Sequence, residues 1–314
     1  MPVIIPNGLP AAETLQNENI FTMDVNRASS QEIRPLKIVI VNLMPTKIAT
    51  ETQLARVLAN SPLQVEMTLV TMSSHETTHT SQEHMNTFYK TLDEIKHEYF
   101  DGMILTGAPV ERMPFERVDY WDEICDIFDF AKTHVYSSLY LCWGAQASLY
   151  YHFGIDKYEL DEKMFGVFEH HVVRPKNPLV RGFDEYYYAP HSRHTAVRRE
   201  DIEKCDSLRI LVDSEEAGPN IISTENGRQI FIMGHHEYDK DTLAEEYFRD
   251  VNSGMNTAIP KNYFRNDDPN DEIMFRWRSH ANLLFSNWLN YYVYQGTPFD
   301  LNELREGEES NDRH

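Results

Sequence analysis

The sequence predicts an α/β fold with three layers, in which a mostly parallel sheet carries helices on both faces. Two observations support this prediction. Short apolar runs, each long enough for one buried strand, alternate over residues 35–151 with longer segments of helical spacing. Successive units of this kind need crossover connections, which produce parallel strands covered by helices on both sides.

Four strand–helix units are expected in the first half of the chain. The strands are expected at residues 37–43, 63–69, 102–107 and 139–141. The helices are expected at residues 51–60, 82–97, 115–132 and 144–151. The first of these strands is apolar along almost its whole length, which is typical of a strand buried on both faces.

The second half of the chain shows a weaker pattern. Residues 155–200 carry charged and aromatic clusters with few clear periods, so we expect an irregular excursion that forms part of a pocket wall. Two short apolar runs, 220–223 and 230–233, flank an Asn-Gly pair that favours a hairpin. Helices are expected over residues 241–252 and along the apolar stripe of 281–292.

No internal repeat and no clear linker divides the chain of 314 residues. We therefore expect a single α/β domain at residues 35–298, which is long enough to bury a large core. Residues 1–34 are polar and contain several Pro and Asn, so they are expected to form an arm packed over this domain. Residues 299–314 are expected to form an acidic tail.

The composition excludes several classes of protein. A net charge of −21, from 29 basic and 50 acidic residues, argues against a general nucleic-acid binder, which needs a basic face. No run approaches the roughly 18 apolar residues of a membrane span, and the N-terminus lacks the pattern of a signal peptide. Three scattered cysteines form no disulfide framework. A cytoplasmic protein without a membrane partner is expected.

Cys142 lies where an apolar strand ends and a small-residue helix begins. A thiol at this junction is close to the free N–H groups and the positive end of a helix, which favour a thiolate. By contrast, Cys125 lies within an apolar helical pattern and Cys205 in a polar segment, as is typical of unreactive thiols. Cys142 is therefore the candidate nucleophile.

A second strand ends in a base and a carboxylate. His235 and Glu237 follow the run at residues 230–233, and together with Cys142 they supply a nucleophile, a base and an orienting carboxylate. In a parallel sheet such strand ends meet at one edge. The turn after residues 102–107 reaches the same edge, so the N–H groups of Ala108 and Trp143 are the candidate oxyanion hole.

These residues resemble the class I glutamine amidotransferase superfamily, which has a flavodoxin-like arrangement of strands and helices. Cys142-Trp143-Gly144-Ala145-Gln146 matches the nucleophile motif and His235-His236-Glu237 matches the rest of the triad. The sequence departs from the motif at Tyr140, where these glutaminases usually have glycine.

A closer resemblance is to the homoserine O-succinyltransferase and O-acetyltransferase family, and it extends to about Pro298. Six segments carry it in order: residues 38–47, 105–111, 142–147, 163–168, 191–194 and 234–238. The resemblance implies an acyltransferase of methionine biosynthesis, which acylates the hydroxyl of L-homoserine from an acyl-CoA. It implies a ping-pong mechanism through an acyl-thioester on Cys142, with no cofactor besides the acyl-CoA substrate. A homodimer is a candidate assembly.

The same resemblance implies roles for further residues. Homoserine binding falls on Lys163, Ser192 and Arg249. The position that separates acetyl from succinyl donors falls on Glu111, and glutamate there accompanies acetyl-CoA. Lys47, at the end of the first strand, is a candidate contact for an anionic part of the acyl donor.

Four alternatives remain open at this point. The first is an acyltransferase of the same family that uses succinyl-CoA as the acyl donor. The second is a glutaminase-like cysteine hydrolase with water as the acceptor. A metal enzyme is suggested only by the 14 histidines, which lack the spacing of a zinc site. The last is a binding protein without catalysis, which would not need a nucleophile, base and orienting carboxylate at adjacent strand ends.

Overall fold

The computed structural model describes residues 3–18, 22–23, 34–75 and 80–304. One sheet of twelve described strands passes through it in the order β2-β1-β4-β3-β6-β7-β12-β11-β10-β8-β9, and β5 pairs with β4. The strand bounds are β1 Val3–Ile4, β2 Thr22–Met23, β3 Leu36–Val41, β4 Val65–Val70, β5 Tyr89–Lys90, β6 Phe100–Leu105, β7 Val135–Leu141, β8 Lys157–Val172, β9 Tyr186–Val197, β10 Leu208–Asp213, β11 Ile221–Thr224 and β12 Gln229–Ile232.

The sheet has a parallel part and an antiparallel part. The strands from β2 to β12 in the sheet order pair in parallel, including the central β3, β6 and β7. From β12 onward the pairs with β11, β10, β8 and β9 are antiparallel. The parallel part follows from the predicted strand–helix units, and the hairpin of β11 and β12 turns at the predicted Asn-Gly pair.

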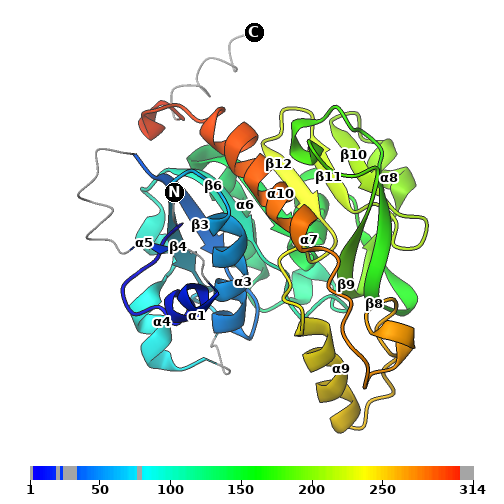
Figure 1. Cartoon of the computed structure of the whole chain (residues 1–314). Helices are drawn as coiled ribbons and strands as arrows, with labels where there is room; N and C mark the ends of the chain where they lie inside the picture. The colour runs from blue at the N-terminus through cyan, green and yellow to red at the C-terminus, as the bar shows by residue number, and fades with distance from the viewer. Residues whose placement is uncertain (1–2, 19–21, 24–33, 76–79, 305–314) are drawn as a thin grey trace.

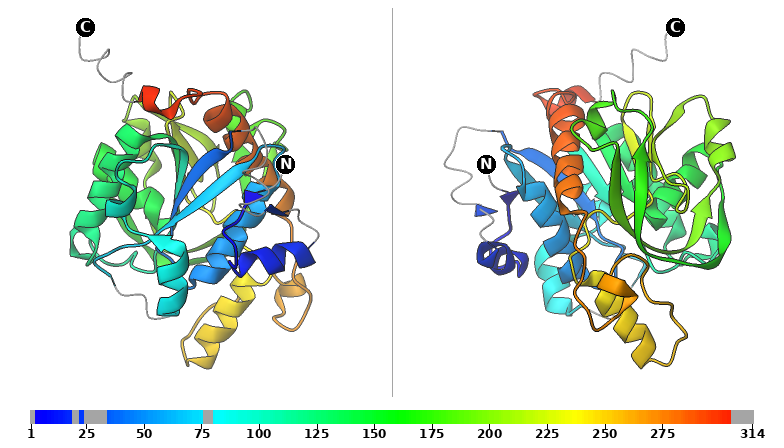
Figure 2. Two further views of the ribbon diagram at one scale, coloured as in Figure 1. Left: turned by 90° about the vertical axis from the view of Figure 1, so that its left-hand side faces the viewer. Right: turned by 45° about the vertical axis from the view of Figure 1, so that its right-hand side comes forward.

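Helices cover both faces of the sheet (Figures 1 and 2). Their bounds are α1 Ala11–Asn17, α3 Lys47–Ala59, α4 Gln82–Phe88, α5 Leu92–Ile95, α6 Trp121–His134, α7 Trp143–Phe153, α8 Arg199–Glu203, α9 Thr242–Asn252 and α10 Arg278–Asn287. Short helical turns follow: η1 Phe115–Arg117, η2 Pro178–Val180, η3 Arg265–Asp267, η4 Trp288–Tyr294 and η5 Leu301–Leu304. Within the described residues, no helix is both long and apolar enough to cross a membrane.

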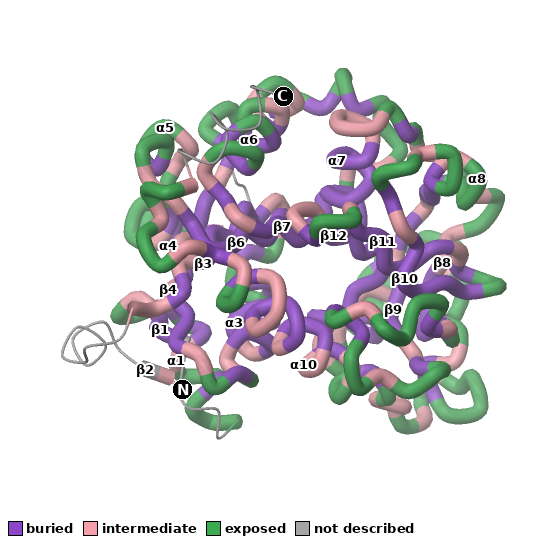
Figure 3. Tube along the Cα trace, turned by 90° about the horizontal axis from the view of Figure 1, so that it is seen from above, coloured by how far each residue is buried: buried purple, intermediate pink, exposed green. Residues whose placement is uncertain are grey.

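Each face of the sheet has its own hydrophobic core. The first core joins one face to α1, α3 and α10 through residues such as Leu54 and Leu284. The second core joins the other face to α5, α6 and α7 through residues such as Phe128 and Leu149. Seen from above, buried strands run between these helical layers (Figure 3). The predicted α/β fold with helices on both faces of a mostly parallel sheet is therefore confirmed.

Two predictions of secondary structure were wrong. The helix expected over residues 82–97 is divided, because Tyr89–Lys90 pairs with β4 and Thr91 then begins α5 with a capping box. Residues 155–200 are not irregular, because β8 and β9 form a long antiparallel pair with a register shift between Glu159 and Met164. Aromatic and charged side chains alternate on this pair without the apolar period of a buried strand.

The predicted division into arm, domain and tail stays a prediction. Of residues 1–34, the described ones include β1, which pairs with β4, and α1, whose Ala11 and Leu15 are buried in the first core. Within the acidic tail, residues 305–314 lie outside the described part of the chain.

Candidate active site

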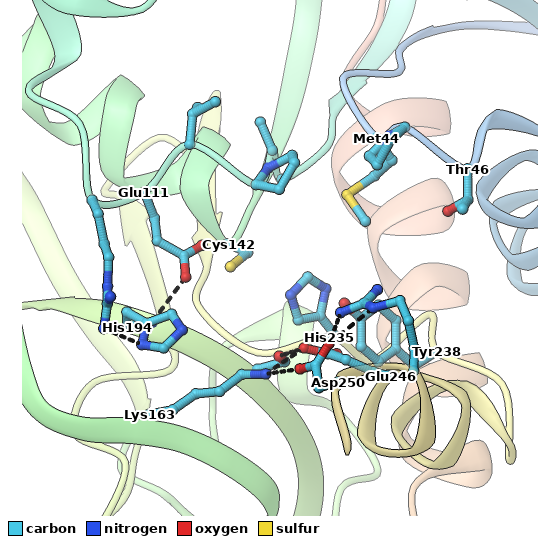
Figure 4. Close-up of a pocket in the computed structure, with 18 of the residues that line it drawn as sticks. Met44, Thr46, Glu111, Cys142, Lys163, His194, His235, Tyr238, Glu246 and Asp250 are labelled. Carbon is cyan, nitrogen blue, oxygen red and sulfur yellow. Dashed lines mark hydrogen bonds and ion pairs between the residues drawn. The ribbon is translucent and has the colours of Figure 1, made fainter. Parts of the chain in front are cut away.

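The carboxyl ends of the central parallel strands border a cavity of about 470 Å³. The turns after β3, β6 and β7 and the loop after β12 form its floor and one side. Strands β8 and β9 and helix α9 supply the opposite wall (Figure 4). The lining includes, among others, Met44, Gly107, Ala108, Glu111, Cys142, Lys163, Ser192, His235, Tyr238, Glu246, Arg249 and Asp250.

Cys142 occupies the sharp turn between β7 and α7. Its φ of 49° and ψ of −113° lie outside the usual regions for a residue with a side chain, and such strain costs about 1–3 kcal/mol. Two backbone hydrogen bonds hold the turn: the Cys142 N–H donates to Ile232 O at 2.7 Å, and the Gln146 N–H donates to Cys142 O at 3.1 Å. Cys142 is 95% buried yet lines the cavity, the placement expected of the predicted nucleophile.

Close packing of α7 on the end of β6 sets the space beside the thiol. A Cβ built on Gly144 would lie 2.4 Å from Leu105 Cδ2 and 2.7 Å from Thr106 O, so glycine is needed there. A Cβ built on Gly107 would lie 3.3 Å from Cys142 Cβ and 3.7 Å from the backbone nitrogen of Trp143. The chain thus leaves a small open volume next to the cysteine.

The backbone around this volume contains the predicted oxyanion donors. Trp143 is the first residue of α7, so its N–H has no acceptor within the helix. Ala108 is buried and lines the cavity on the facing turn. The role of these two N–H groups stays a prediction.

His235 and Glu237 are buried in the loop after β12. His235 Nδ1 lies 2.8 Å from Glu237 Oε1, and the His235 ring is stacked on Tyr238 with centroids 4.1 Å apart. Burial alone would lower the pKa of His235, but the negative charges of Cys142 and Glu237 raise it well above its ordinary value. The two side chains beside the ring therefore favour the protonated, imidazolium form of His235.

Lys163, Ser192 and Arg249, predicted from different parts of the sequence, all line the cavity. Figure 4 shows Lys163 beside Glu246 and Asp250. Lys163 Nζ lies 2.5 Å from Glu246 Oε1, and the Ser192 hydroxyl donates to the same oxygen at 2.7 Å. Arg249 donates from Nε and Nη2 to Asp250 Oδ1 at 2.9 and 2.7 Å.

Sequence reasoning missed Glu246 and Asp250, which partner all three predicted binding residues. One signal could have found them. Glu246, Arg249 and Asp250 have the spacing of neighbours on one helical face, in the helix directly after the triad loop.

Glu111 faces the cavity from the turn after β6, beside Cys142 and His194 (Figure 4). Its Oε1 accepts a hydrogen bond from the His194 N–H at 3.1 Å. Burial raises the pKa of this carboxyl above its usual value, and the His194 N–H together with the positive charges of His235 and Lys163 only partly offsets the effect.

Lys47 lies elsewhere. Its side chain is buried in the first turn of α3, outside the residues that line the cavity, and Nζ donates to Asn42 O at 2.5 Å. Burial lowers the pKa of Lys47 to about 8, although the nearby Glu51 partly opposes this shift. α3 begins at Lys47, and the side chain points inward. The contact with the acyl donor stays a prediction.

Among the histidines that suggested a metal enzyme, His170 and His191 contact each other, with their Nε2 atoms 3.0 Å apart. His236 points away from its neighbour His235, and its Nε2 lies 3.2 Å from the Tyr187 hydroxyl. In the part of the chain that the structure describes, no group of three or more His, Cys, Asp or Glu side chains is arranged to hold a metal ion.

Comparison with known proteins decides between the alternatives for the family. The model of the family described as homoserine O-succinyltransferase matches residues 2–299. The chain belongs to this family. It is 62% identical over 301 residues to the homoserine O-acetyltransferase of Clostridium acetobutylicum, which covers 96% of this chain and all of the relative. It is 59% identical over 305 residues to the enzyme of the same name from Acetivibrio thermocellus, which covers 97% of this chain and all of the relative.

The solved structures agree on the fold alone. A glutamine amidotransferase from Thermotoga maritima matches with a TM-score of 0.52 at 12% identity, over 82% of this chain and 98% of that one. A glutamine amidotransferase from Methylobacillus flagellatus matches with a TM-score of 0.50 at 10% identity, over 82% of this chain and 95% of that one. Its family and relatives make this protein an acyltransferase, as the sequence predicted. Its fold is the predicted glutamine amidotransferase-like fold.

Proposed function

We propose that this acyltransferase moves an acetyl group from acetyl-CoA to the hydroxyl of L-homoserine through a thioester on Cys142. The observation that carries the proposal is that Cys142 and His235, the latter paired with the buried Glu237, line a cavity whose wall holds charged groups suited to an amino acid. The names of the relatives at 59% and 62% identity support both substrates.

The first half-reaction releases CoA. The Cys142 thiolate attacks the thioester carbon, and the carbonyl oxygen becomes an oxyanion near the N–H groups of Trp143 and Ala108. The bond from carbon to the CoA sulfur then breaks. The imidazolium of His235 gives its proton to the departing thiolate, while Glu237 keeps the ring oriented.

The second half-reaction runs in the reverse sense with homoserine. Neutral His235 accepts the proton of the homoserine hydroxyl as its oxygen attacks the acyl carbon. The bond from that carbon to Cys142 Sγ breaks, which restores the thiolate and the imidazolium. Protons and charges therefore balance over one cycle without any group beyond the two substrates.

The wall of the cavity accounts for the acceptor. Arg249 presents a planar fork that suits a carboxylate, and Lys163 lies on the same wall. Glu246 already accepts hydrogen bonds from Lys163 and Ser192, and it offers a carboxylate for an ammonium group. These groups match the two charges of an amino acid such as homoserine.

Glu111 accounts for the choice of donor. A carboxylate in the cavity near Cys142 occupies the space in which the terminal carboxylate of a succinyl group would lie, and it would repel that group. The family description, which names O-succinyl transfer, favours succinyl-CoA as the second candidate donor. We propose that the reaction uses no cofactor besides the acyl-CoA. We also propose that the enzyme is cytosolic.

Mass spectrometry tests the proposal directly. The protein is incubated with acetyl-CoA or succinyl-CoA in the absence of homoserine, and the modified peptide is identified. We expect an acetyl group on Cys142, its removal by homoserine, and no acyl group in Cys142→Ala. The matched controls Cys125→Ala and Cys205→Ala should be acylated normally. Acylation of another residue, or normal turnover by Cys142→Ala, would contradict the proposal.

A further inference from the structure

Arg193 is a buried cation that hydrogen bonds connect to the turn of Cys142. Along β9, Ser192 and His194 face the cavity, whereas the side chain of Arg193 between them points to the opposite side and is 99% buried. A guanidinium at this depth has lost its hydration, which is unfavourable unless an opposite charge or hydrogen bonds replace it.

The hydrogen bonds of Arg193 all go to neutral acceptors. Nη1 donates to Thr195 O and Nη2 to Ala217 O, both at 2.7 Å, and Nε donates to His191 Nδ1 at 3.3 Å. Within the described residues, Arg193 forms no ion pair with an Asp or Glu side chain. Its positive charge therefore has hydrogen-bond partners but no carboxylate to neutralise it.

The neighbouring histidines are neutral. Because Arg193 Nε–H donates to His191 Nδ1, the proton of that ring is on Nε2, which donates to His170 Nε2 at 3.0 Å. His170 then carries its proton on Nδ1 and donates to Phe168 O at 2.9 Å. Burial lowers the pKa of His170 to about 3 and that of His191 well below its ordinary value. Neither ring adds a charge beside Arg193.

A short chain of hydrogen bonds joins Arg193 to the turn that carries Cys142. Thr195 O accepts from both Arg193 Nη1 and Gln146 Nε2, and the Thr195 hydroxyl donates to Gln146 Oε1 at 2.8 Å. The N–H of Gln146 in turn donates to the Cys142 carbonyl. The buried guanidinium is thus fixed to the first turn of α7.

Among the groups near Arg193 that can carry a negative charge, Cys142 has the largest effect on the guanidinium. Burial lowers the pKa of Arg193, and the negative charge of Cys142 opposes this shift more than those of Tyr158 and Glu111 do. Burial raises the pKa of Glu111, which weakens it as a permanent anion.

We propose that Arg193 is the buried countercharge of the Cys142 thiolate and positions that thiolate for attack. The thiolate, the His235 imidazolium and the Glu237 carboxylate carry one net negative charge in a buried region. Arg193 brings the sum to zero, which lets the thiolate and the imidazolium persist together before the donor arrives. This inference rests on the proposed role of Cys142 as the nucleophile, and Arg193 itself touches no substrate.

Alkylation by iodoacetamide tests the proposal, because it reports the thiolate without any acyl donor. The protein carries Cys125→Ser and Cys205→Ser, so that only Cys142 reacts. At about pH 6, where an ordinary thiol is mostly protonated, Arg193→Met and Arg193→Gln should react at least about tenfold more slowly than the parent. The deficit should largely disappear at about pH 9, and Arg193→Lys, which keeps the charge, should react nearly as fast as the parent at both pH values.

The outcomes separate an electrostatic role from a structural one. Folded neutral variants that alkylate like the parent at low pH would overturn the proposal, as would an Arg193→Lys variant as slow as they are. If neither neutral variant folds, a folded and reactive Arg193→Lys supports the charge, and failure of the lysine variant as well overturns it. Failure of the proposed function would look different, because acylation would then occur away from Cys142 whatever the alkylation rates.

Discussion

Replacement of Glu111 by glycine should change the acyl donor. The carboxylate lines the cavity near Cys142, and its position is fixed by the hydrogen bond from the His194 N–H. Glycine removes both the charge and the bulk from the region next to the acyl group. We expect Glu111→Gly to lose most of its preference for acetyl-CoA and to accept succinyl-CoA.

The magnitude follows from the repulsion between two carboxylates. At about 5 Å and an effective dielectric near 20, like unit charges repel by about 3 kcal/mol. This energy corresponds to roughly a hundredfold change in the ratio of the two donors. The raised pKa of Glu111 and the nearby positive charge of Lys163 reduce the net repulsion, so the hundredfold value is an upper estimate.

The assay measures kcat/KM for both donors in the wild type, Glu111→Gly and the control Glu111→Gln. Glutamine keeps most of the bulk, so its donor ratio should lie between those of the other two proteins. The pH dependence gives an independent check. Since burial raises the pKa of Glu111, the carboxyl gains a proton at a higher pH than usual. As pH falls, the wild type should therefore shift toward succinyl-CoA more than Glu111→Gln does. An unchanged donor ratio in Glu111→Gly would refute this reasoning.

Two further predictions concern the acceptor and the elbow. Arg249→Ala should raise the KM for homoserine at least about tenfold, the loss expected for a charged hydrogen-bonded pair, while CoA release without homoserine stays nearly constant. Equal loss in both half-reactions, measured by stopped-flow and steady-state assays, would indicate a structural role instead. Gly144→Ala should lower the free energy of unfolding by about 2 kcal/mol or more, because its Cβ would overlap Leu105, whereas Gly154→Ala meets no atom within 4 Å and should cost about 1 kcal/mol for its positive φ. Equal urea midpoints for the two variants would show that the packing of α7 on β6 is not the constraint.

The meeting of Cys142, His235 and Glu237 could be predicted from the sequence because each part follows a recognisable strand. The runs before Cys142 and His235 become the neighbouring strands β7 and β12, which pair in parallel. Their carboxyl ends must therefore lie side by side, and the residues that follow must meet. His235 and Glu237 are only two positions apart in the same loop, so their contact could be predicted without knowledge of the fold.

The wall of the cavity could not be predicted in the same way. Lys163 and Ser192 come from β8 and β9, whose alternation is hidden by Tyr, His and charged residues on both faces. Only the long-range pairing of these strands brings the two side chains to one place. The burial of Lys47 could not be predicted either, because a charged residue at a strand end looks available for a ligand, yet the helix begins there and buries it.

The two parts of the sheet divide the work of the enzyme. Under the proposed function, the parallel part supplies the nucleophile, the base and the oxyanion donors. Glutamine amidotransferases have the same fold. The antiparallel part and α9 supply Lys163, Ser192, Glu246 and Arg249, which select the acceptor under the proposed function. Because a thiolate beside an imidazolium will attack many acyl compounds, the chemistry of the triad alone does not choose between water and homoserine. That choice depends on whether the wall holds an amino acid with its hydroxyl toward the acyl group. Exchanges of residues on this wall should therefore change the acceptor without changing acylation of Cys142.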